Sequence, residues 1–241
     1  MYDEHNVKKA IGHALDTFYK TLIDKLNTID IDLIMRRKNP YLYRAKAMHS
    51  ATDIVGSVLF AFISSSEETI FGNCFFEPIA IAASGGEKAL AEGLDLIIYN
   101  HSDNSVTAIA VKSGTSVYNA DSKKRQEQNF IAASKLATQA KQRYEAIIGY
   151  SYGKKRLSTR GMPRIYQELA GQAFWERITG DSNFYKKLIG YMEDMPEHYA
   201  LLFNEAYQKA ENRMVRDFAN KFCTTDGSIN WDKLLEFNSG K

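Results

Sequence analysis

The chain has 241 residues, 44% of them hydrophobic, which is enough for one large domain or two small ones with a buried core. Its formal net charge of +2 excludes a globally basic protein and restricts any nucleic-acid contact to local patches. Two cysteines, Cys74 and Cys223, are too few for a disulfide framework or a cysteine-based zinc site. The apolar run from Ile54 to Ile63 fits a buried helix, and no secretory signal is evident. We therefore expect a soluble cytoplasmic protein with no membrane partner.

Apolar residues at helical spacing predict an amphipathic helix over residues 7–27. A basic stretch ending at Pro40 breaks this pattern. The apolar pattern that follows predicts a second helix from about Arg44 to Ile63.

Ser65 followed by Glu68 resembles a capping box and predicts that a third helix starts there and runs toward Ala83. Pro78 lies inside this stretch, where it either kinks the helix or starts its second part. The Ser-Gly-Gly at residues 84–86 ends the helix.

Two apolar, β-branched segments predict a β-hairpin over residues 94–114. Asp95 lies on the first segment, Lys112 on the second, and Asn100–Asn104 between them is typical of a turn. An antiparallel hairpin would bring this carboxylate and this ammonium group onto one face of a sheet. Such a layout is typical of metal-dependent phosphodiesterases, although on spacing alone a surface salt bridge is the stronger reading.

Beyond the hairpin, Asp121 or Ser122 can cap a long helix that runs to about Tyr144. Residues 145–152 predict a further strand, followed by a basic loop and a mainly helical C-terminal third. The order helix, strand, strand, helix, strand predicts an α/β (α+β) fold with a mixed β-sheet flanked by helices.

No internal repeat or convincing linker divides the chain, so we predict a single domain over residues 1–241. We expect its core at about residues 44–152, with helical additions at residues 1–43 and 165–241.

Hydrolysis of a phosphodiester by a hard divalent ion such as Mg²⁺ needs oxygen ligands and a group that stabilises negative charge. Asp95 and the main-chain carbonyl of Val111 could supply ligands, and Lys112 could stabilise the charge or position water. Ala110 shares a face with Lys112, where a further ligand would be expected, and alanine cannot be one. A replacement acid must therefore come from elsewhere.

Glu77 is the favoured replacement because it lies among apolar residues, where an unpaired carboxylate would be costly. Glu68 is second, since the capping box already gives it a local role. Glu92 is weaker, because it precedes the strand and can simply be solvated.

Asp95 followed by a strand with Ala110-Val111-Lys112 resembles the PD-(D/E)XK nuclease superfamily. Longer strings between residues 36 and 190 are similar to one group of type II restriction endonucleases, the TdeIII/PmeII-like enzymes. These strings are Asn39–Lys46, Ser64–Gly72, Val111–Gly114, Gly171–Glu176, Ile178–Asp181 and Phe184-Tyr185.

The resemblance implies a restriction-endonuclease-like core with extra N- and C-terminal helices, and a Mg²⁺-dependent enzyme that cuts double-stranded DNA at a short sequence, usually as a homodimer. It implies that Asp95 is the metal-binding acid, Lys112 the catalytic lysine and Glu77 the helix glutamate near the metal. The chain departs from the family pattern at Leu94 (usually proline), at Ala110 (usually an acid) and in the loop after Gly114.

Basic and amide side chains supply candidate DNA contacts, since basic groups hold phosphates and amides read base edges. For each group the competing reading is an ordinary solvated surface. The candidates are Asn119, Lys123, Lys124, Arg125 and Gln126 at the start of the long helix, Arg36 and Arg37, and Lys154 and Lys155 with Arg156, Arg160 and Arg164.

Two other functions compete with a restriction endonuclease. One is a structure-specific or repair nuclease on the same fold. The other, motivated by Ala110, is a catalytically degenerate DNA-binding protein.

Overall fold

The structure is a computed structural model that describes residues 2–155 and 165–240. The chain divides into two compact units: unit 1 comprises Met1–Thr17 and Phe71–Pro196, and unit 2 comprises Phe18–Ile70 and Glu197–Lys241. Three long helices contribute residues to both units, namely α1 (Glu4–Thr28), α4 (Ala51–Cys74) and α9 (Met195–Phe222). The predicted single-domain organisation stays a prediction.

Unit 1 contains a five-stranded mixed sheet in the order β1-β2-β3-β4-β5. The pairs β1/β2 and β2/β3 are antiparallel, whereas β3/β4 and β4/β5 are parallel. The predicted mixed sheet and the predicted hairpin, β2 with β3, are both confirmed. The strands are β1 (Glu87–Lys88), β2 (Leu96–Asn100), β3 (Ser105–Lys112), β4 (Arg143–Tyr150) and β5 (Gln167–Ala170).

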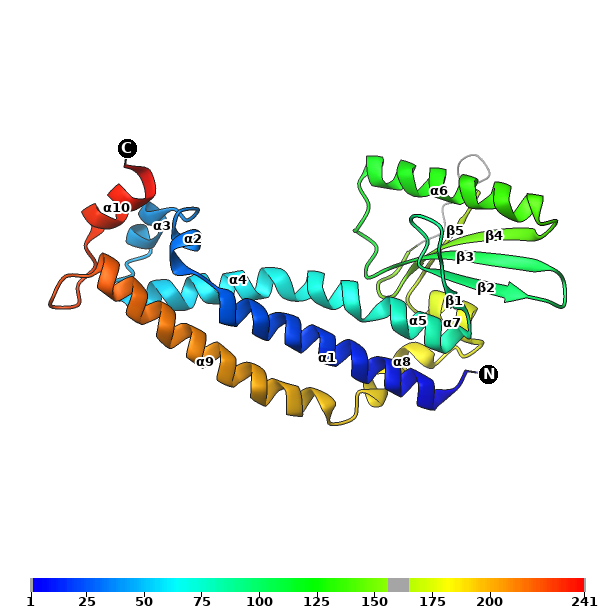
Figure 1. Cartoon of the computed structure of the whole chain (residues 1–241), viewed down its shortest axis with the longest axis horizontal. Coiled ribbons are helices and arrows are strands. Elements are labelled where there is room, and N and C mark those ends of the chain that lie inside the picture. Colours follow the sequence, from blue (N-terminus) through cyan, green and yellow to red (C-terminus); the bar gives the residue numbers. More distant parts are fainter. Residues whose placement is uncertain (1, 156–164, 241) are drawn as a thin grey trace. The chain divides into compact units, whose positions relative to one another are not determined.

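Helices cover both faces of this sheet (Figure 1). On one face lies α6 (Ala120–Gln139), whose Phe130 is fully buried against Ala110, Ile148 and Tyr150 of the strands. On the other face lie α5 (Phe76–Ser84) and α7 (Gln172–Thr179), and α8 (Phe184–Tyr191) follows α7. Because β3, β4 and β5 run parallel, their carboxyl ends lie at the same edge of the sheet.

The predicted capping box at Ser65 is wrong, because α4 runs without a break through this position. The Ser65 hydroxyl donates to the main-chain oxygen of Phe62 within the same helix, as serine does when it lies in a helix interior. The break comes after Cys74, and Pro78 stands in the first turn of α5. Pro78 therefore starts the second part of the stretch, one of its two predicted roles.

The long helix after the hairpin is shorter than predicted. Asn119, rather than Asp121 or Ser122, is its N-cap: the side chain of Asn119 accepts from the Ser122 main-chain N–H, and the Ser122 hydroxyl caps in return. The helix ends at Gln139, and Lys141 takes a positive φ of 56° before β4 begins. Tyr144 lies in β4, where it pairs with Val106 of β3, as suits an aromatic residue with a preference for strands.

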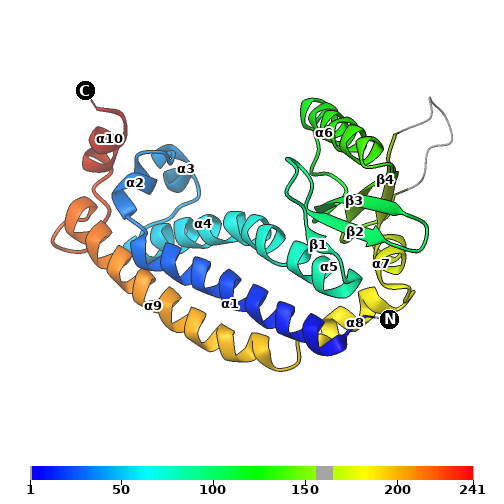
Figure 2. The same cartoon turned by 45° about the vertical axis from the view of Figure 1, so that its right-hand side comes forward.

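Unit 2 is helical: parts of α1, α4 and α9 are accompanied by three short helices that appear together in both views (Figure 2). Its core is apolar and includes Met35, Ile54, Leu59 and Phe218. The helix predicted from Arg44 is wrong in its start, because α3 ends at Ala45 and α4 begins only at residue 51. The short helices are α2 (Ile31–Met35), α3 (Pro40–Ala45) and α10 (Trp231–Ser239).

One helical stretch of the described residues, Ala51–Ser84, is long and apolar enough to cross a membrane by length and composition alone. The shorter apolar run Ile54–Ile63 predicted a buried helix, but not a helical stretch of this length. A core helix of the same composition passes the same test, and α4 places Ile54, Val55 and Val58 in the core of unit 2. The absence of a membrane partner stays a prediction.

Candidate active site

The hairpin brings Asp95 and Lys112 together. Asp95 directly precedes β2, and its main-chain N–H donates to the oxygen of Ile109 over 2.9 Å, which extends the ladder by one residue. The Lys112 Nζ lies 3.0 Å from Asp95 Oδ2, and the Val111 N–H donates to the same oxygen over 2.7 Å. The predicted pair is therefore formed, and the strand backbone holds the carboxylate in place.

Asp95 and Lys112 line a polar pocket of about 250 Å³. Asp95, Lys112 and Glu77 are each roughly one-quarter exposed, so solvent reaches all three side chains. Glu77 comes from the first turn of α5, so the pocket collects a helix carboxylate and a strand carboxylate. Its other lining residues are Gly72, Asn73, Val111, Ser113 and Val117.

The oxygens of this pocket fit a hard divalent ion. Asp95 Oδ1 makes no hydrogen bond within residues 2–155 and 165–240, since both contacts of this carboxylate use Oδ2. The Val111 carbonyl points to the same side of β3 as its N–H, toward Asp95, because both groups of a strand residue face one neighbour. Glu77 adds a second carboxylate. The described residues contain no group of three His, Cys, Asp or Glu side chains suited to a metal, so waters would complete the shell, as Mg²⁺ prefers.

Ala110 does not line the pocket. It is fully buried in the core between the sheet and α6, with Phe130 and Tyr150 in the same cluster. A carboxylate at this position would have to enter an apolar core, which is costly without partners. The alanine thus suits the packing of α6, and the pocket's second acid comes from α5.

The three candidate replacement acids lie in different places. Glu77 lines the pocket and pairs with Lys88, whose Nζ lies 3.1 Å from Glu77 Oε1. Glu68 lies inside α4 in unit 2 and is not among the residues that line the pocket. Glu92 pairs with Arg125 in an exposed ion pair.

Two of the candidate DNA contacts have structural roles in this fold. Gln126 is buried: its side-chain nitrogen donates to the Gly93 oxygen over 2.7 Å and its side-chain oxygen accepts from the Tyr118 hydroxyl over 2.9 Å. Reading base edges with Gln126 is therefore excluded, because the face of α6 that carries it packs on the sheet. Asn119 is exposed but serves as the N-cap of α6.

The remaining basic candidates are distributed over both units. Lys124 and Lys154 are exposed in unit 1, where Arg125 is held by Glu92, while Arg36 and Arg37 are exposed in unit 2. Their roles in DNA binding stay predictions. Arg156, Arg160 and Arg164 lie outside the described residues.

Lys123 and Lys155 meet at a buried carboxylate that the sequence did not single out. Glu168 on β5 has a side chain only 2% exposed, and its Oε1 accepts from Lys123 over 3.0 Å, from Lys155 over 2.5 Å and from the Tyr150 hydroxyl over 2.8 Å. Burial alone raises the pKa of the Glu168 carboxyl, but the donors from Lys155, Lys123 and Tyr150 outweigh it and lower this pKa to about 2. Among the described residues, two ammonium groups thus share this one carboxylate.

Tyr118 lies on the same side of the sheet, and its ring contacts that of Tyr150 at 6.4 Å between centroids. Burial, followed by the charge of Asp95, raises the pKa of the Tyr118 hydroxyl. Tyr118 therefore stays protonated at neutral pH and donates to Gln126. The sequence offers no strong signal for Glu168, because it follows another polar residue, Gln167, in a short strand.

Glu168→Gln is expected to lower the free energy of unfolding by about 3 kcal/mol at pH 7, because it leaves two lysines beside a neutral amide in a buried site. The carboxyl pKa is depressed in the folded state, so its stabilisation is complete above the ordinary value of 4.5 and is lost as pH falls toward about 2. The difference between wild type and variant should therefore shrink over that range. Urea denaturation at several pH values measures it.

Glu145→Gln is the matched control on the neighbouring strand. Glu145 pairs with Arg177, and both side chains are substantially exposed, so this change should cost no more than about 1 kcal/mol. Equal losses in the two variants, or a difference that does not vary with pH, would contradict the role given to Glu168.

A match to a known protein family covers both the sheet and the pocket. The profile of the family described as "Type II restriction endonuclease EcoO109I" matches residues 5–198, well over half of the chain. No curated protein matches the chain. The matched region includes the complete sheet, the Asp95–Lys112 pair and Glu77. The chain therefore belongs to the EcoO109I family of type II restriction endonucleases.

Proposed function

We propose that this protein is a Mg²⁺-dependent endonuclease that hydrolyses double-stranded DNA at a specific sequence and leaves 5′-phosphate and 3′-hydroxyl ends. The observation that carries the proposal is the polar pocket in which Asp95, Lys112 and the Val111 main chain are held together by hydrogen bonds, in a chain of a restriction endonuclease family. We also propose that it acts in the cytoplasm as a homodimer.

Each residue of the pocket has a role in this proposal. Asp95 Oδ1, the Glu77 carboxylate and the Val111 carbonyl would hold a Mg²⁺ ion, which would supply activation of water and neutralisation of phosphate charge. Lys112 is oriented by Asp95 Oδ2 and presents an ammonium group to the oxygens on which negative charge develops. Lys124 and Lys154, exposed in the same unit, are available for the DNA backbone.

Purified protein incubated with plasmid DNA and Mg²⁺ is expected to give discrete fragments, and none when EDTA is present. Fragment ends that DNA ligase rejoins without a kinase step would carry 5′-phosphates. Sequencing of the ends would give the recognition site and show whether it suits the narrower resemblance to the TdeIII/PmeII-like enzymes.

Two outcomes favour the competing functions. A smear, or a preference for branched DNA, would support a structure-specific or repair nuclease. Binding without cleavage would support a catalytically degenerate DNA-binding protein, the function that Ala110 motivates.

A further inference from the structure

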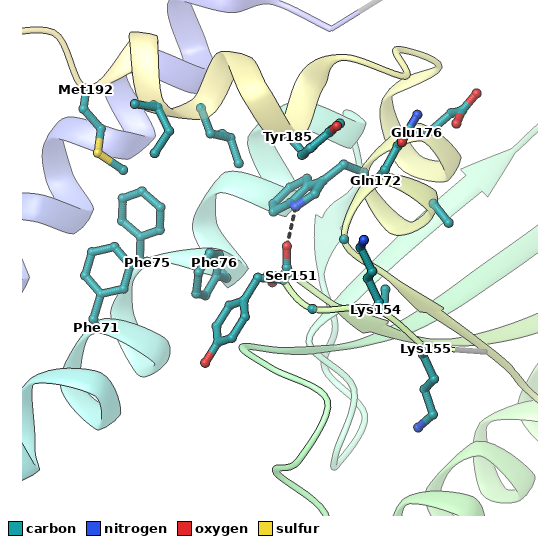
Figure 3. Close-up of a pocket in the computed structure, with 18 residues that line it drawn as sticks. Phe71, Phe75, Phe76, Ser151, Lys154, Lys155, Gln172, Glu176, Tyr185 and Met192 are labelled. Carbon is teal, nitrogen blue, oxygen red and sulfur yellow. Dashed lines mark hydrogen bonds between the residues drawn. The ribbon is translucent and has the colours of Figure 1, made fainter. Parts of the chain in front are cut away.

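A second cavity of about 760 Å³ lies in unit 1 and has no role in the chemistry described above (Figure 3). Its walls are largely aromatic. Phe71, Phe75 and Phe76 line it from the α4–α5 side, and Tyr185 lines it from α8. The loop after β4 supplies Tyr152, whose side chain is about half exposed.

This cavity is joined to the catalytic strand by main-chain hydrogen bonds. The Lys112 oxygen accepts from the Ser151 N–H over 2.7 Å, and the Ser113 oxygen accepts from the Tyr152 N–H over 3.0 Å. A Cβ atom at Gly114 would lie 2.9 Å from the Tyr152 ring, so the loop after the catalytic lysine lies directly against that ring. DNA bound at Lys112 would therefore lie next to this cavity.

One residue of the lining, Ser151, is a buried polar residue in the loop after β4. Ser151 is only 5% exposed, and its main-chain oxygen accepts from the Trp175 indole N–H over 2.8 Å. The Ser151 hydroxyl, however, makes no hydrogen bond within the described part of the chain. The hydroxyl oxygen has almost no accessible surface, so it lies behind the cavity wall and offers no hydrogen bond to a ligand inside the cavity.

The lining also includes other polar side chains, among them the carboxylate of Glu176. Gln172, exposed at the start of α7, brings a side-chain amide, and Lys154 brings an ammonium group that Figure 3 shows turned toward the cavity. Lys155 points away from it and is held by Glu168. Flat aromatic walls, a few hydrogen-bonding groups and a nearby cation are what a nucleobase with its phosphate requires.

We propose that this cavity receives one nucleobase that is unstacked from the DNA substrate during recognition, a step that deepens the function proposed above and rests on it. A base inside a duplex cannot present its faces to a lateral pocket, so the nucleotide has to rotate out of the helix. Tyr152, whose ring is tilted by 49° against that of Phe76, offers an exposed face for stacking, and the Gln172 amide offers a partner for the base edge. Lys154 pairs with the flanking phosphate.

The test begins with the recognition site mapped on plasmid DNA. Duplexes that carry the site, each with one mismatched pair, are measured for affinity with Ca²⁺ in place of Mg²⁺. A mismatch removes much of the cost of unstacking, so at one position the mismatched duplex should bind about tenfold more tightly than the matched duplex. Gln172→Ala should reduce this gain several-fold, because it removes one hydrogen bond to the base.

Ala173→Trp tests the cavity itself, since Ala173 is exposed, lines the cavity and would fill it when enlarged. It should abolish the mismatch gain without changing the thermal unfolding midpoint. Ala132→Trp, exposed on α6 and away from the cavity, is the matched control and should keep the gain.

The outcomes separate this proposal from the function on which it rests. If the protein does not cut DNA, both fail. If it cuts but no mismatch binds more tightly, or if the gain survives in Ala173→Trp, only the base-binding cavity is overturned. The same holds if Ala173→Trp instead converts a dimer to a monomer in size-exclusion chromatography with light scattering, since the cavity would then be a contact between two copies.

Discussion

Lys112→Met is expected to reduce the rate of DNA cleavage by a factor on the order of 10² to 10³ while DNA affinity stays within a few-fold of wild type. The change keeps the apolar stem and removes the ammonium group that lies 3.0 Å from Asp95 Oδ2. Removal of one positioned group that stabilises transition-state charge costs about this much. Single-turnover cleavage of a plasmid, followed beside a gel-shift assay, separates the chemical step from binding.

Lys135→Met is the matched control, because Lys135 is exposed on α6 in the same unit. It should cleave at the wild-type rate. Asp95→Asn should lose at least as much activity as Lys112→Met, since Asp95 orients the lysine and offers Oδ1 to the metal. Near wild-type cleavage by either active-site variant would show that the hairpin is not the catalytic centre.

The hairpin was predictable because its signals are local. Two apolar, β-branched segments and the turn between them define β2 and β3, and their antiparallel pairing brings Asp95 to Lys112. The mixed sheet followed from the order of elements. Packing of Ala110 against α6 was not predictable, because Phe130 lies in a separate element and its contact depends on the tertiary fold.

The errors also have physical causes. Ser65 and Glu68 match the pattern of a helix N-cap. They nevertheless lie in the interior of α4, because the apolar residues of α4 pack into a core and the helix continues through this position. Gln126 is of a residue type that can read base edges. Only the orientation of α6 shows that its amide is already hydrogen-bonded to Gly93 and Tyr118. Glu168 escaped notice because its partner Lys123 lies 45 residues away and no local pattern joins them.

Glu77→Gln is expected to abolish metal-dependent cleavage, with a loss of 10²-fold or more, because Glu77 supplies the pocket's second carboxylate and Ala110 supplies none. The amide keeps the shape of the side chain but removes the charge that attracts a divalent ion. Isothermal titration with Mg²⁺ or Mn²⁺ should show weaker metal binding together with the lost activity.

A variant of Lys88 distinguishes metal binding by Glu77 from a role of Glu77 in an ion pair alone. Glu77 pairs with Lys88, whose side chain is 75% exposed, and a pair of this kind contributes little to stability. If the ion pair were the only function of Glu77, then Lys88→Ala would impair cleavage as much as Glu77→Gln does. If Glu77 is a metal ligand, Lys88→Ala keeps both cleavage and metal affinity close to wild type, because the carboxylate remains in the pocket. Full activity in Glu77→Gln would instead show that another residue supplies the missing acid.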